Sequence, residues 1–210
     1  MDFTRIADQY IDQPFIDAQW CNRPVEVVAP ELVGCTLVRQ WPDGRQLRGM
    51  IVETEAYGPE DPACHAYRGQ TASNAPMFGP PGHSYVYFIY GMYHCFNVVT
   101  DACGIGSAVL IRAVAPEKLP LNLAPKYRQQ GMRVAAGPGK LCRTLAIERR
   151  HSGLPLLPAN RLWIEQRTAA WHSALAQEQA ITQTTRIGIS KAQDYPWRWY
   201  LTGHASVSKP

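Results

Sequence analysis

Residues 36–57 read TLVRQWPDGRQLRGMIVETEAY, and this stretch decides the fold class. Two runs rich in β-branched and apolar residues, 36–40 and 49–55, flank a Trp-Pro-Asp-Gly segment, which is typical of a β-hairpin. Further strands are predicted at residues 85–90, 95–100, 108–114, 186–189 and 197–201. Helical spacing marks fewer segments, at residues 24–32 and 139–146. Because no βαβ alternation appears, the pattern predicts an α+β fold with a largely antiparallel β-sheet and peripheral helices.

The composition is that of one globular domain. The chain has 210 residues, of which 46% are hydrophobic and 18% are charged. No repeat, low-complexity tract or linker divides it, so residues 1–210 are predicted to form a single domain with a sizeable core. Residues 1–25 are a predicted N-terminal helical extension, interrupted at Pro14. Six cysteines lie scattered without paired spacing, which favours reduced, buried thiols over a disulfide or zinc framework.

The sequence also predicts where the protein works. No apolar run approaches the roughly 20 residues that span a bilayer. The first residues, MDFTRIADQY, lack the basic start and apolar core of a signal peptide. Both observations predict an intracellular protein that does not contact a membrane, located in the cytoplasm or nucleoid of a prokaryote or in the nucleus of a eukaryote.

Charge is distributed unevenly along the chain, although the formal net charge is only +4. Residues 1–62 contain eleven acidic and five basic side chains, whereas residues 118–150 contain eight basic ones and a single acid, Glu148. Such asymmetry is typical of a protein with one face against a polyanion. Charge alone leaves a solvated basic loop equally open.

Two carboxylates stand two residues apart where the second strand of the hairpin ends. Glu53 and Glu55 would project from the same face of a strand, with Tyr57 next on that face and His65 shortly after it. An acid, an aromatic ring and an imidazole together are suited to activating water beside a flat ligand. The residues alone leave a second interpretation open, in which both acids are solvated charges on an edge strand.

A ring-rich segment follows at residues 85–97, YVYFIYGMYHCFN. Its two predicted strands leave Tyr90, Gly91 and Met92 at the tip of a hairpin, and a tip position argues against a core role for Tyr90. The stretch 58–82 before it is rich in Gly and Pro and is a predicted irregular loop. Loops of that length inside a compact domain are usually functional.

Three blocks resemble the alkyladenine (3-methyladenine) DNA glycosylase family: ETEAY with His65 eight residues beyond its tyrosine, YVYFIYGMYHCFN, and GPGKLCRTLAI. The resemblance extends over residues 27–204. It implies a small single domain with a curved antiparallel sheet and neither metal nor cofactor. It also implies a base-excision repair enzyme that flips an alkylated or deaminated purine (3-methyladenine, 7-methylguanine, hypoxanthine or ethenoadenine) out of duplex DNA. Hydrolysis of the N-glycosidic bond would leave an abasic site, and because no lysine is placed as a nucleophile, a monofunctional enzyme is expected.

The resemblance assigns catalytic roles to two residues. Glu55 matches the general base that directs the attacking water, whereas Glu53 resembles a supporting residue. Arg112, in the predicted strand VLIRAV, matches an arginine near the water and a phosphate. A charged residue in an apolar strand needs a partner, so a buried structural ion pair remains an alternative for Arg112.

Other matched residues concern the base and the DNA. The resemblance implies a base-binding pocket whose rings enclose the flipped purine, formed by Tyr57, His65, Tyr87, Asn97 and Ile187. Within it, Asn97 would discriminate against guanine by crowding its exocyclic amine. Tyr90 and Met92 resemble residues that intercalate into the base stack. At a helix start, Lys140 and Gly139 would bind a DNA phosphate.

Two other classes of function remain open from the residues. A non-catalytic nucleic-acid-binding module would keep the basic face and the hairpin tip but would not need Glu55. A metal-dependent hydrolase would use Glu53, Glu55 and His65, with a further ligand from His83 or His94. The partner that the resemblance implies is double-stranded DNA containing damaged purines. No obligate protein partner is inferred, and a monomer is expected.

Overall fold

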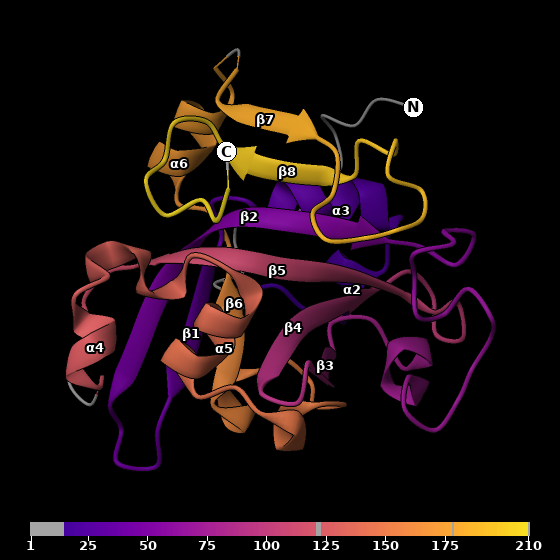
Figure 1. Ribbon diagram of the computed structural model, residues 1–210, viewed down its shortest axis with the longest axis horizontal. Helices are drawn as coiled ribbons and strands as arrows, with labels where there is room; N and C mark the ends of the chain where they lie inside the picture. Colours follow the sequence, from indigo (N-terminus) through magenta and orange to yellow (C-terminus); the bar gives the residue numbers. More distant parts are fainter. Residues whose placement is uncertain (1–14, 121–122, 178, 210) are drawn as a thin grey trace.

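The computed structural model describes residues 15–120, 123–177 and 179–209. Within these residues the strands form one eight-stranded antiparallel sheet with helices around it (Figure 1). The strands are β1 (Thr36–Gln40), β2 (Gln46–Tyr57), β3 (Ser84–Ile89), β4 (Tyr93–Thr100), β5 (Ser107–Pro116), β6 (Leu162–Glu165), β7 (Ile181–Thr184) and β8 (Arg198–Leu201). Their main order is β3-β4-β5-β2-β1-β6, and β8 pairs with both β2 and β7. The predicted α+β class with an antiparallel sheet is therefore confirmed.

Strands β1 and β2 form the hairpin that the Asp-Gly turn predicts. Thr36 lies opposite Met50 and Gln40 lies opposite Gln46, and the amide of Trp41 donates to the carbonyl of Arg45 across the turn. Strand β2 already begins at Gln46, before the predicted start at residue 49. Pairing with β1 thus extends the strand beyond its apolar pattern.

Strand β2 is the centre of the sheet because its two edges have three partners. β5 pairs along one edge, where Glu55 lies opposite Leu110 and Tyr57 opposite Ala108. On the other edge, β1 pairs with the first half of β2 and β8 pairs with residues 53–55. Figure 1 shows β7 and β8 above β2, and β1 and β6 descending below it. The predicted site carboxylates therefore lie at a fork in the sheet, enclosed by strands on both sides.

The strands β3, β4 and β5 have one face in the core and the other toward a cavity. The core-facing side chains are each at most 1% exposed: Val86, Phe96, Val98, Val109 and Ile111. The alternate residues point the opposite way and line the cavity: Tyr85, Tyr87, Cys95, Asn97, Leu110 and Arg112. This two-residue alternation is what a pleated strand imposes on its side chains.

Helix α3 (Val25–Leu32) covers the core-facing side of the sheet. Its buried residues recur at helical spacing on one stripe: Val25, Val28, Ala29 and Leu32. The hydroxyl of Thr54 in β2 donates to the carbonyl of Ala29 at 2.8 Å. Because Thr54 alternates with the two glutamates, α3 holds β2 from the face opposite to theirs.

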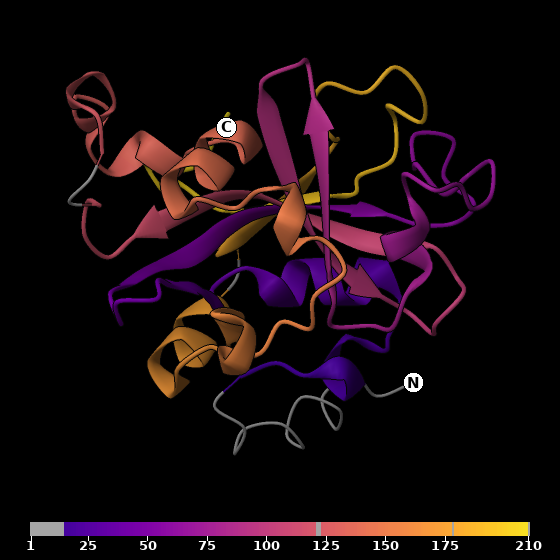
Figure 2. The same ribbon diagram turned by 90° about the horizontal axis from the view of Figure 1, so that it is seen from below.

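Helix α5 (Pro138–Leu145) forms where helical spacing predicts one, and it packs against β4 and β5. Figure 2 shows that the β3–β4 hairpin, α5 and α4 (Pro125–Arg128) project from the same side of the molecule. The other helical segments are short: α2 (Ala18–Cys21), η2 (Ala75–Phe78), η3 (Gly131–Ala135), η4 (Arg149–His151), η5 (Pro158–Asn160) and α6 (Ala169–Leu175).

The prediction of a strand at residues 186–189 is wrong. The strand that pairs with β8 is β7, and residues 186–189 form a loop between β7 and β8. Ile187 and Ile189 alternate as strand residues would, but Gly188 between them has φ of 77°, which a strand does not allow. Arg186 binds Asp61 and the carbonyl of Ala56 instead, and these bonds fix the loop beside β2.

The predicted N-terminal extension at residues 1–25 lies partly outside the described residues, which begin at residue 15. The described part contains α2, and its side chains Ile16 and Trp20 are buried in the core. All six cysteines are free thiols and five are buried, as the scattered spacing predicts.

Candidate active site

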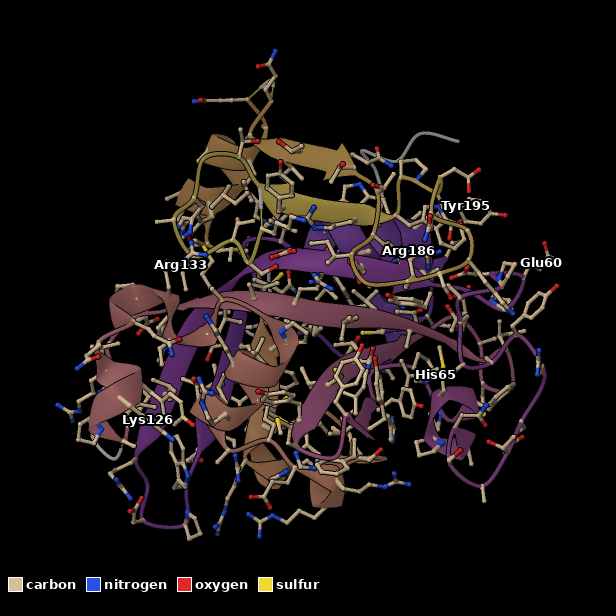
Figure 3. The ribbon with its side chains drawn as sticks, viewed as in Figure 1. Glu60, His65, Lys126, Arg133, Arg186 and Tyr195 are labelled. Atoms are coloured by element: carbon tan, nitrogen blue, oxygen red, sulfur yellow. The ribbon has the colours of Figure 1, made fainter. Side chains whose placement is uncertain are left out.

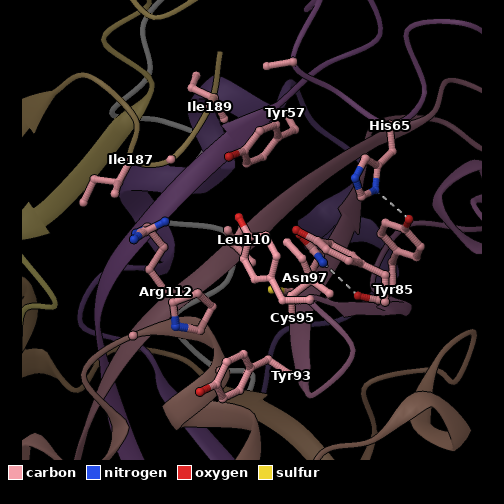
Figure 4. A pocket seen from close by; sticks show the side chains of 18 of the residues that line it. Tyr57, His65, Tyr85, Tyr93, Cys95, Asn97, Leu110, Arg112, Ile187 and Ile189 are labelled. Carbon is pink, nitrogen blue, oxygen red and sulfur yellow. Dashed lines mark hydrogen bonds between the residues drawn. The ribbon is translucent and has the colours of Figure 1, made fainter. Parts of the chain in front are cut away.

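A cavity of about 760 Å³ opens on the face of the sheet opposite α3 (Figure 4). Its walls come from β2 to β5, from the loop after β2, from the β7–β8 loop and from the start of α5. Most of the predicted site residues line it: Tyr57, His65, Tyr87, Tyr90, Asn97, Arg112, Gly139, Lys140 and Ile187. Glu55 lies behind this wall and Met92 lies beyond it, at the hairpin tip.

Glu55 is fully buried and is held by three hydrogen bonds. Oε2 accepts from the hydroxyl of Tyr57 at 2.9 Å and from Nη1 of Arg112 at 3.1 Å, and Oε1 accepts from the amide of Ile187 at 2.8 Å. Since a carboxylate has about four acceptor positions, the described residues leave one on Oε1. All three donors belong to residues that line the cavity, so the carboxylate is oriented from the cavity wall.

Glu53 is also fully buried, but its oxygens are more completely occupied. Oε1 accepts from Arg112, Arg198 and the hydroxyl of Ser208 at 2.8 to 2.9 Å, and Oε2 accepts from the amide of Ser208 at 2.7 Å. Burial alone would raise the pKa of Glu53, but Arg112, the two Ser208 bonds and Arg198 together lower it below its ordinary value. Glu53 is therefore an ionised carboxylate with four hydrogen bonds, three of them from Arg198 and Ser208, which do not line the cavity.

Arg112 lies between the two acids. Its Nε donates to Glu53 at 2.9 Å and its Nη1 donates to Glu55 at 3.1 Å. Burial would lower the pKa of Arg112, but the charges of Glu55 and Glu53 raise it. The buried ion pair that the sequence left open for Arg112 is present, and Arg112 also lines the cavity, so the two interpretations are compatible.

The β2–β5 register is irregular at this point. Glu53 pairs with Ala113, while Ile51 with Val114 and Thr54 with Ile111 follow one common register on either side. Local irregularities in a ladder commonly re-aim a side chain next to a functional site. Here the irregularity falls where Arg112 reaches both carboxylates.

Three rings form one wall of the cavity, those of His65, Tyr85 and Tyr87. His65 and Tyr87 meet edge to face, with ring centroids 4.5 Å apart, and Nδ1 of His65 lies 2.8 Å from the hydroxyl of Tyr85. Partial burial lowers the pKa of His65, so its imidazole is neutral at pH 7. Burial and the charge of Glu55 raise the pKa of Tyr57, so its hydroxyl stays protonated and donates to that carboxylate. Figure 4 shows Tyr57 and His65 on neighbouring sides of the cavity.

Asn97 lies on the floor of the cavity and is 4% exposed. Its Nδ2 donates to the carbonyl of Tyr85 at 2.9 Å, which fixes the orientation of the amide (Figure 4). Cys95 and Leu110 lie beside it on the same face. A ligand in the cavity would therefore meet a rigid polar group on this floor.

The hairpin tip is the most exposed apolar feature near the cavity. Tyr90 is 79% exposed and Met92 is 65% exposed, and Tyr90 has φ of 54°, in the left-handed region. Tyr90 also lines the rim of the cavity. A large ring held in solvent beside a concave site is available to contact a ligand that covers the rim.

The start of α5 contributes Lys140 and Gly139 to the rim of the cavity. A Cβ at residue 139 would lie 2.9 Å from the ring of Tyr93, so only glycine permits this contact between α5 and the β3–β4 hairpin. Gly139 therefore has a packing role, whatever it contributes to phosphate binding.

Comparisons with known proteins show the family of this chain. A family model described as methylpurine-DNA glycosylase (MPG) matches residues 19–205. The chain belongs to the methylpurine-DNA glycosylase family. A relative from Synechococcus sp. (strain JA-3-3Ab), named "Putative 3-methyladenine DNA glycosylase", is 52% identical over 194 residues, which cover 90% of this chain and 97% of that protein.

Two further relatives carry the same name. The protein of Trichodesmium erythraeum (strain IMS101) is 52% identical over 199 residues, covering 92% of this chain and 97% of its own. The protein of Carboxydothermus hydrogenoformans (strain ATCC BAA-161 / DSM 6008 / Z-2901) is 46% identical over 192 residues, which cover 91% of this chain and 97% of that protein. The family resemblance seen in three sequence blocks is confirmed, and the chain is a DNA repair glycosylase of the methylpurine type.

Sequence reasoning missed two residues of this methylpurine-DNA glycosylase site. Tyr85 lines the cavity and holds His65, and its place two residues before Tyr87 on one strand would have revealed it. Arg186 lies behind Tyr57, with its guanidinium 4.7 Å from the ring centroid, and it is paired with Asp61. No local pattern signals that contact, because the two residues are far apart in sequence.

Two residues of the predicted basic segment, Lys140 and Arg143, line the same cavity. Figure 3 shows Lys126 and Arg133 on the other side of the molecule from His65 and Arg186. Arg143 of α5 lines the cavity and stacks on Tyr127, with 3.7 Å from its guanidinium carbon to the ring centroid. Its Nε and Nη2 have no hydrogen-bond partner among the described residues. A shielded guanidinium without an acceptor is a suitable phosphate contact.

The sequence left a metal-dependent hydrolase open, and the described residues contain no cluster of side chains that would support it. In residues 15–120, 123–177 and 179–209, no three His, Cys, Asp or Glu side chains are arranged to hold a metal ion. Among the same residues, no helix is both long and apolar enough to cross a bilayer.

Proposed function

We propose that this glycosylase hydrolyses the N-glycosidic bond of alkylated or deaminated purines in duplex DNA with a water activated by Glu55. The observation that carries the proposal is a fully buried carboxylate, with one acceptor position left, behind a ring-walled cavity. Glu53 is less suited to the same task, because three of its four hydrogen bonds come from Arg198 and Ser208, which do not line the cavity. The substrates are 3-methyladenine, 7-methylguanine, hypoxanthine and ethenoadenine.

The cavity suits a flipped purine. Tyr57, His65 and Tyr87 offer ring faces and edges to a flat base, and aromatic faces attract a cation by about 0.5–2 kcal/mol. A purine methylated at N3 or N7 carries a positive charge, so such walls favour the damaged base over a normal one. Asn97, whose amide is fixed by the Tyr85 carbonyl, crowds the exocyclic amine of unmodified guanine at the floor, and the positive charge of 7-methylguanine offsets the same crowding.

The chemical step requires a water molecule, Glu55 as its base and Arg112 beside Glu55. The bond between C1′ and the purine nitrogen breaks with its electron pair leaving on the base, while water oxygen bonds to C1′ and one water proton passes to Glu55. A cationic 3-methyladenine leaves as a neutral base, whereas hypoxanthine must gain a proton from water or the pocket. Arg112 neutralises part of the charge of Glu55 and keeps its carboxylate aimed at the cavity.

The DNA is held and opened from the same side of the molecule. Tyr90 and Met92 enter the base stack where the lesion has rotated out, which offsets a few kcal/mol of unstacking. Lys140, the start of α5 and Arg143 bind phosphates without regard to sequence. The product is an abasic site, since water and not an amine attacks C1′.

The deciding experiment is single-turnover excision in EDTA from duplexes that carry one hypoxanthine or one 3-methyladenine. The wild type should release the free base, and Glu55→Gln should lose at least about 10²-fold in rate while it still binds the duplex. Glu60→Gln, which removes an exposed acid from the loop after β2, is the matched control and should keep wild-type rates (Figure 3).

Two outcomes would contradict the proposal. Full activity of Glu55→Gln would remove the carboxylate from the mechanism, and tight binding without release of any damaged purine would mean a binding module. Borohydride trapping tests the monofunctional claim, because a covalent adduct through Lys140 or Lys191, which both line the cavity, would identify an amine nucleophile.

A further inference from the structure

The buried charge network behind the cavity extends to a segment remote from Glu55 in sequence. Glu53 shares Arg112 with Glu55, and it is also bound by Arg198 of β8 and by Ser208. Ser208 donates twice, from its amide at 2.7 Å and from its hydroxyl at 2.9 Å. The two acids and two arginines balance in charge, and all four side chains are buried.

Two carboxylates compete for one guanidinium in this arrangement. Arg112 gives Nε to Glu53 and Nη1 to Glu55, and since both nitrogens belong to one planar group, a movement of the guanidinium changes both bonds. The donors that satisfy Glu53 from its other side therefore decide how Arg112 is divided between the two acids. Those donors are Arg198 and Ser208.

We propose that Ser208 and Arg198 are positioning residues for base excision, acting through Glu53 and Arg112 on the orientation of Glu55. The inference rests on the role of Glu55 proposed above. Neither Ser208 nor Glu53 lines the cavity, so neither touches the base. Each can reach the reacting atoms only by the route of hydrogen bonds Ser208–Glu53–Arg112–Glu55.

The packing around Ser208 separates this role from a merely structural one. Val207 beside it is 3% exposed in the core, and the hydroxyl of Ser206 donates to the carbonyl of Met132 at 3.2 Å. These contacts hold the segment independently of the Ser208 hydroxyl. Removal of that hydroxyl alone should leave the backbone in place and leave Glu53 with one donor fewer.

The test is single-turnover excision, lesion-duplex affinity and thermal unfolding of the full chain for the wild type, Ser208→Ala and Ser206→Ala. Ser208→Ala should lower the excision rate about three- to tenfold, because small displacements of a catalytic group are costly. Its affinity should stay at the wild-type value, its melting temperature should fall no further than that of Ser206→Ala, and Ser208→Thr should restore the rate. Ser206→Ala, the matched control from the same segment, should keep the wild-type rate.

A double-mutant cycle tests the route itself. In an Arg112→Lys background, Ser208→Ala should change the excision rate less than twofold, because the connection to Glu55 is already cut. An unchanged rate in Ser208→Ala would overturn the proposal, and so would additive effects in the cycle. Parallel losses of rate and melting temperature in both serine variants would assign the segment to folding alone. Absence of base release by the wild type would instead overturn the proposed function.

Discussion

The hydroxyl of Tyr57 donates a 2.9 Å hydrogen bond to Oε2 of Glu55, so one wall of the cavity also orients the carboxylate behind it. The ring of Tyr57 should therefore contribute to lesion affinity, and its hydroxyl should contribute to the excision rate. Tyr57→Phe should keep lesion affinity within about twofold and lower the single-turnover excision rate about three- to tenfold. Tyr57→Ala, which also removes the ring, should weaken affinity as well. Equal losses of affinity in both variants would contradict this division.

The exposed ring of Tyr90 leads to a prediction about base flipping. Tyr90→Ala should weaken binding to a lesion-containing duplex by about 1–3 kcal/mol and leave the melting temperature unchanged, because the ring makes no core contact. Competition binding with matched lesion and undamaged duplexes measures the loss. Tyr67→Ala is the control, since Tyr67 is 48% exposed but does not line the cavity. Similar losses in the two variants would show that the effect is not specific to the hairpin tip.

The basic rim predicts a defined salt dependence. Lys140→Gln and Arg143→Gln should each reduce the slope of log affinity for undamaged duplex against log salt by about one, the effect of one lost phosphate contact. Arg48→Gln should leave the slope unchanged, because Arg48 is already paired with Glu165 and Glu117. Titrations at several salt concentrations check the three slopes, and a reduced slope in Arg48→Gln would refute the assignment.

His151 predicts how stability depends on pH. It is 6% exposed, its Nε2 lies 3.1 Å from Nη2 of Arg39, and burial together with that charge lowers its pKa below the ordinary 6.5. The unfolded chain therefore binds more protons, so the free energy of unfolding falls as pH drops through 6.5, until the native ring also protonates. His151→Asn should flatten this dependence between pH 7 and 5. Urea unfolding at each pH measures it, and an unchanged dependence would refute the prediction.

The sequence predicted the fold well where side-chain alternation and turn chemistry act locally. The hairpin around Asp43 and Gly44, the strands of the ring-rich segment and the helix after Gly137 all depend on such local signals. The segment 186–189 misled for a related reason, because Ile187 and Ile189 imitate a strand. The positive φ of Gly188 and the bonds of Arg186 to Asp61 and to the Ala56 carbonyl explain why this segment is a loop.

The residues of the site could be predicted from the sequence, but the hydrogen bonds that connect them could not. Alternation placed Glu53 and Glu55 on one face, and both bind Arg112. Nothing in the local sequence distinguishes the two acids, and the resemblance alone favoured Glu55. The difference comes from Ser208 and Arg198, which approach Glu53 from segments remote in sequence.

The contact between Tyr93 and Gly139 has a consequence for how lesions are found. Tyr93 begins β4 directly after the exposed tip, and its ring packs against the backbone at the start of α5, where phosphate contacts are proposed. This contact ties the position of the hairpin that carries Tyr90 to the position of the proposed phosphate contacts. In an enzyme that slides along DNA, Tyr90 would then meet each base step at the same distance from the phosphate bound at the start of α5.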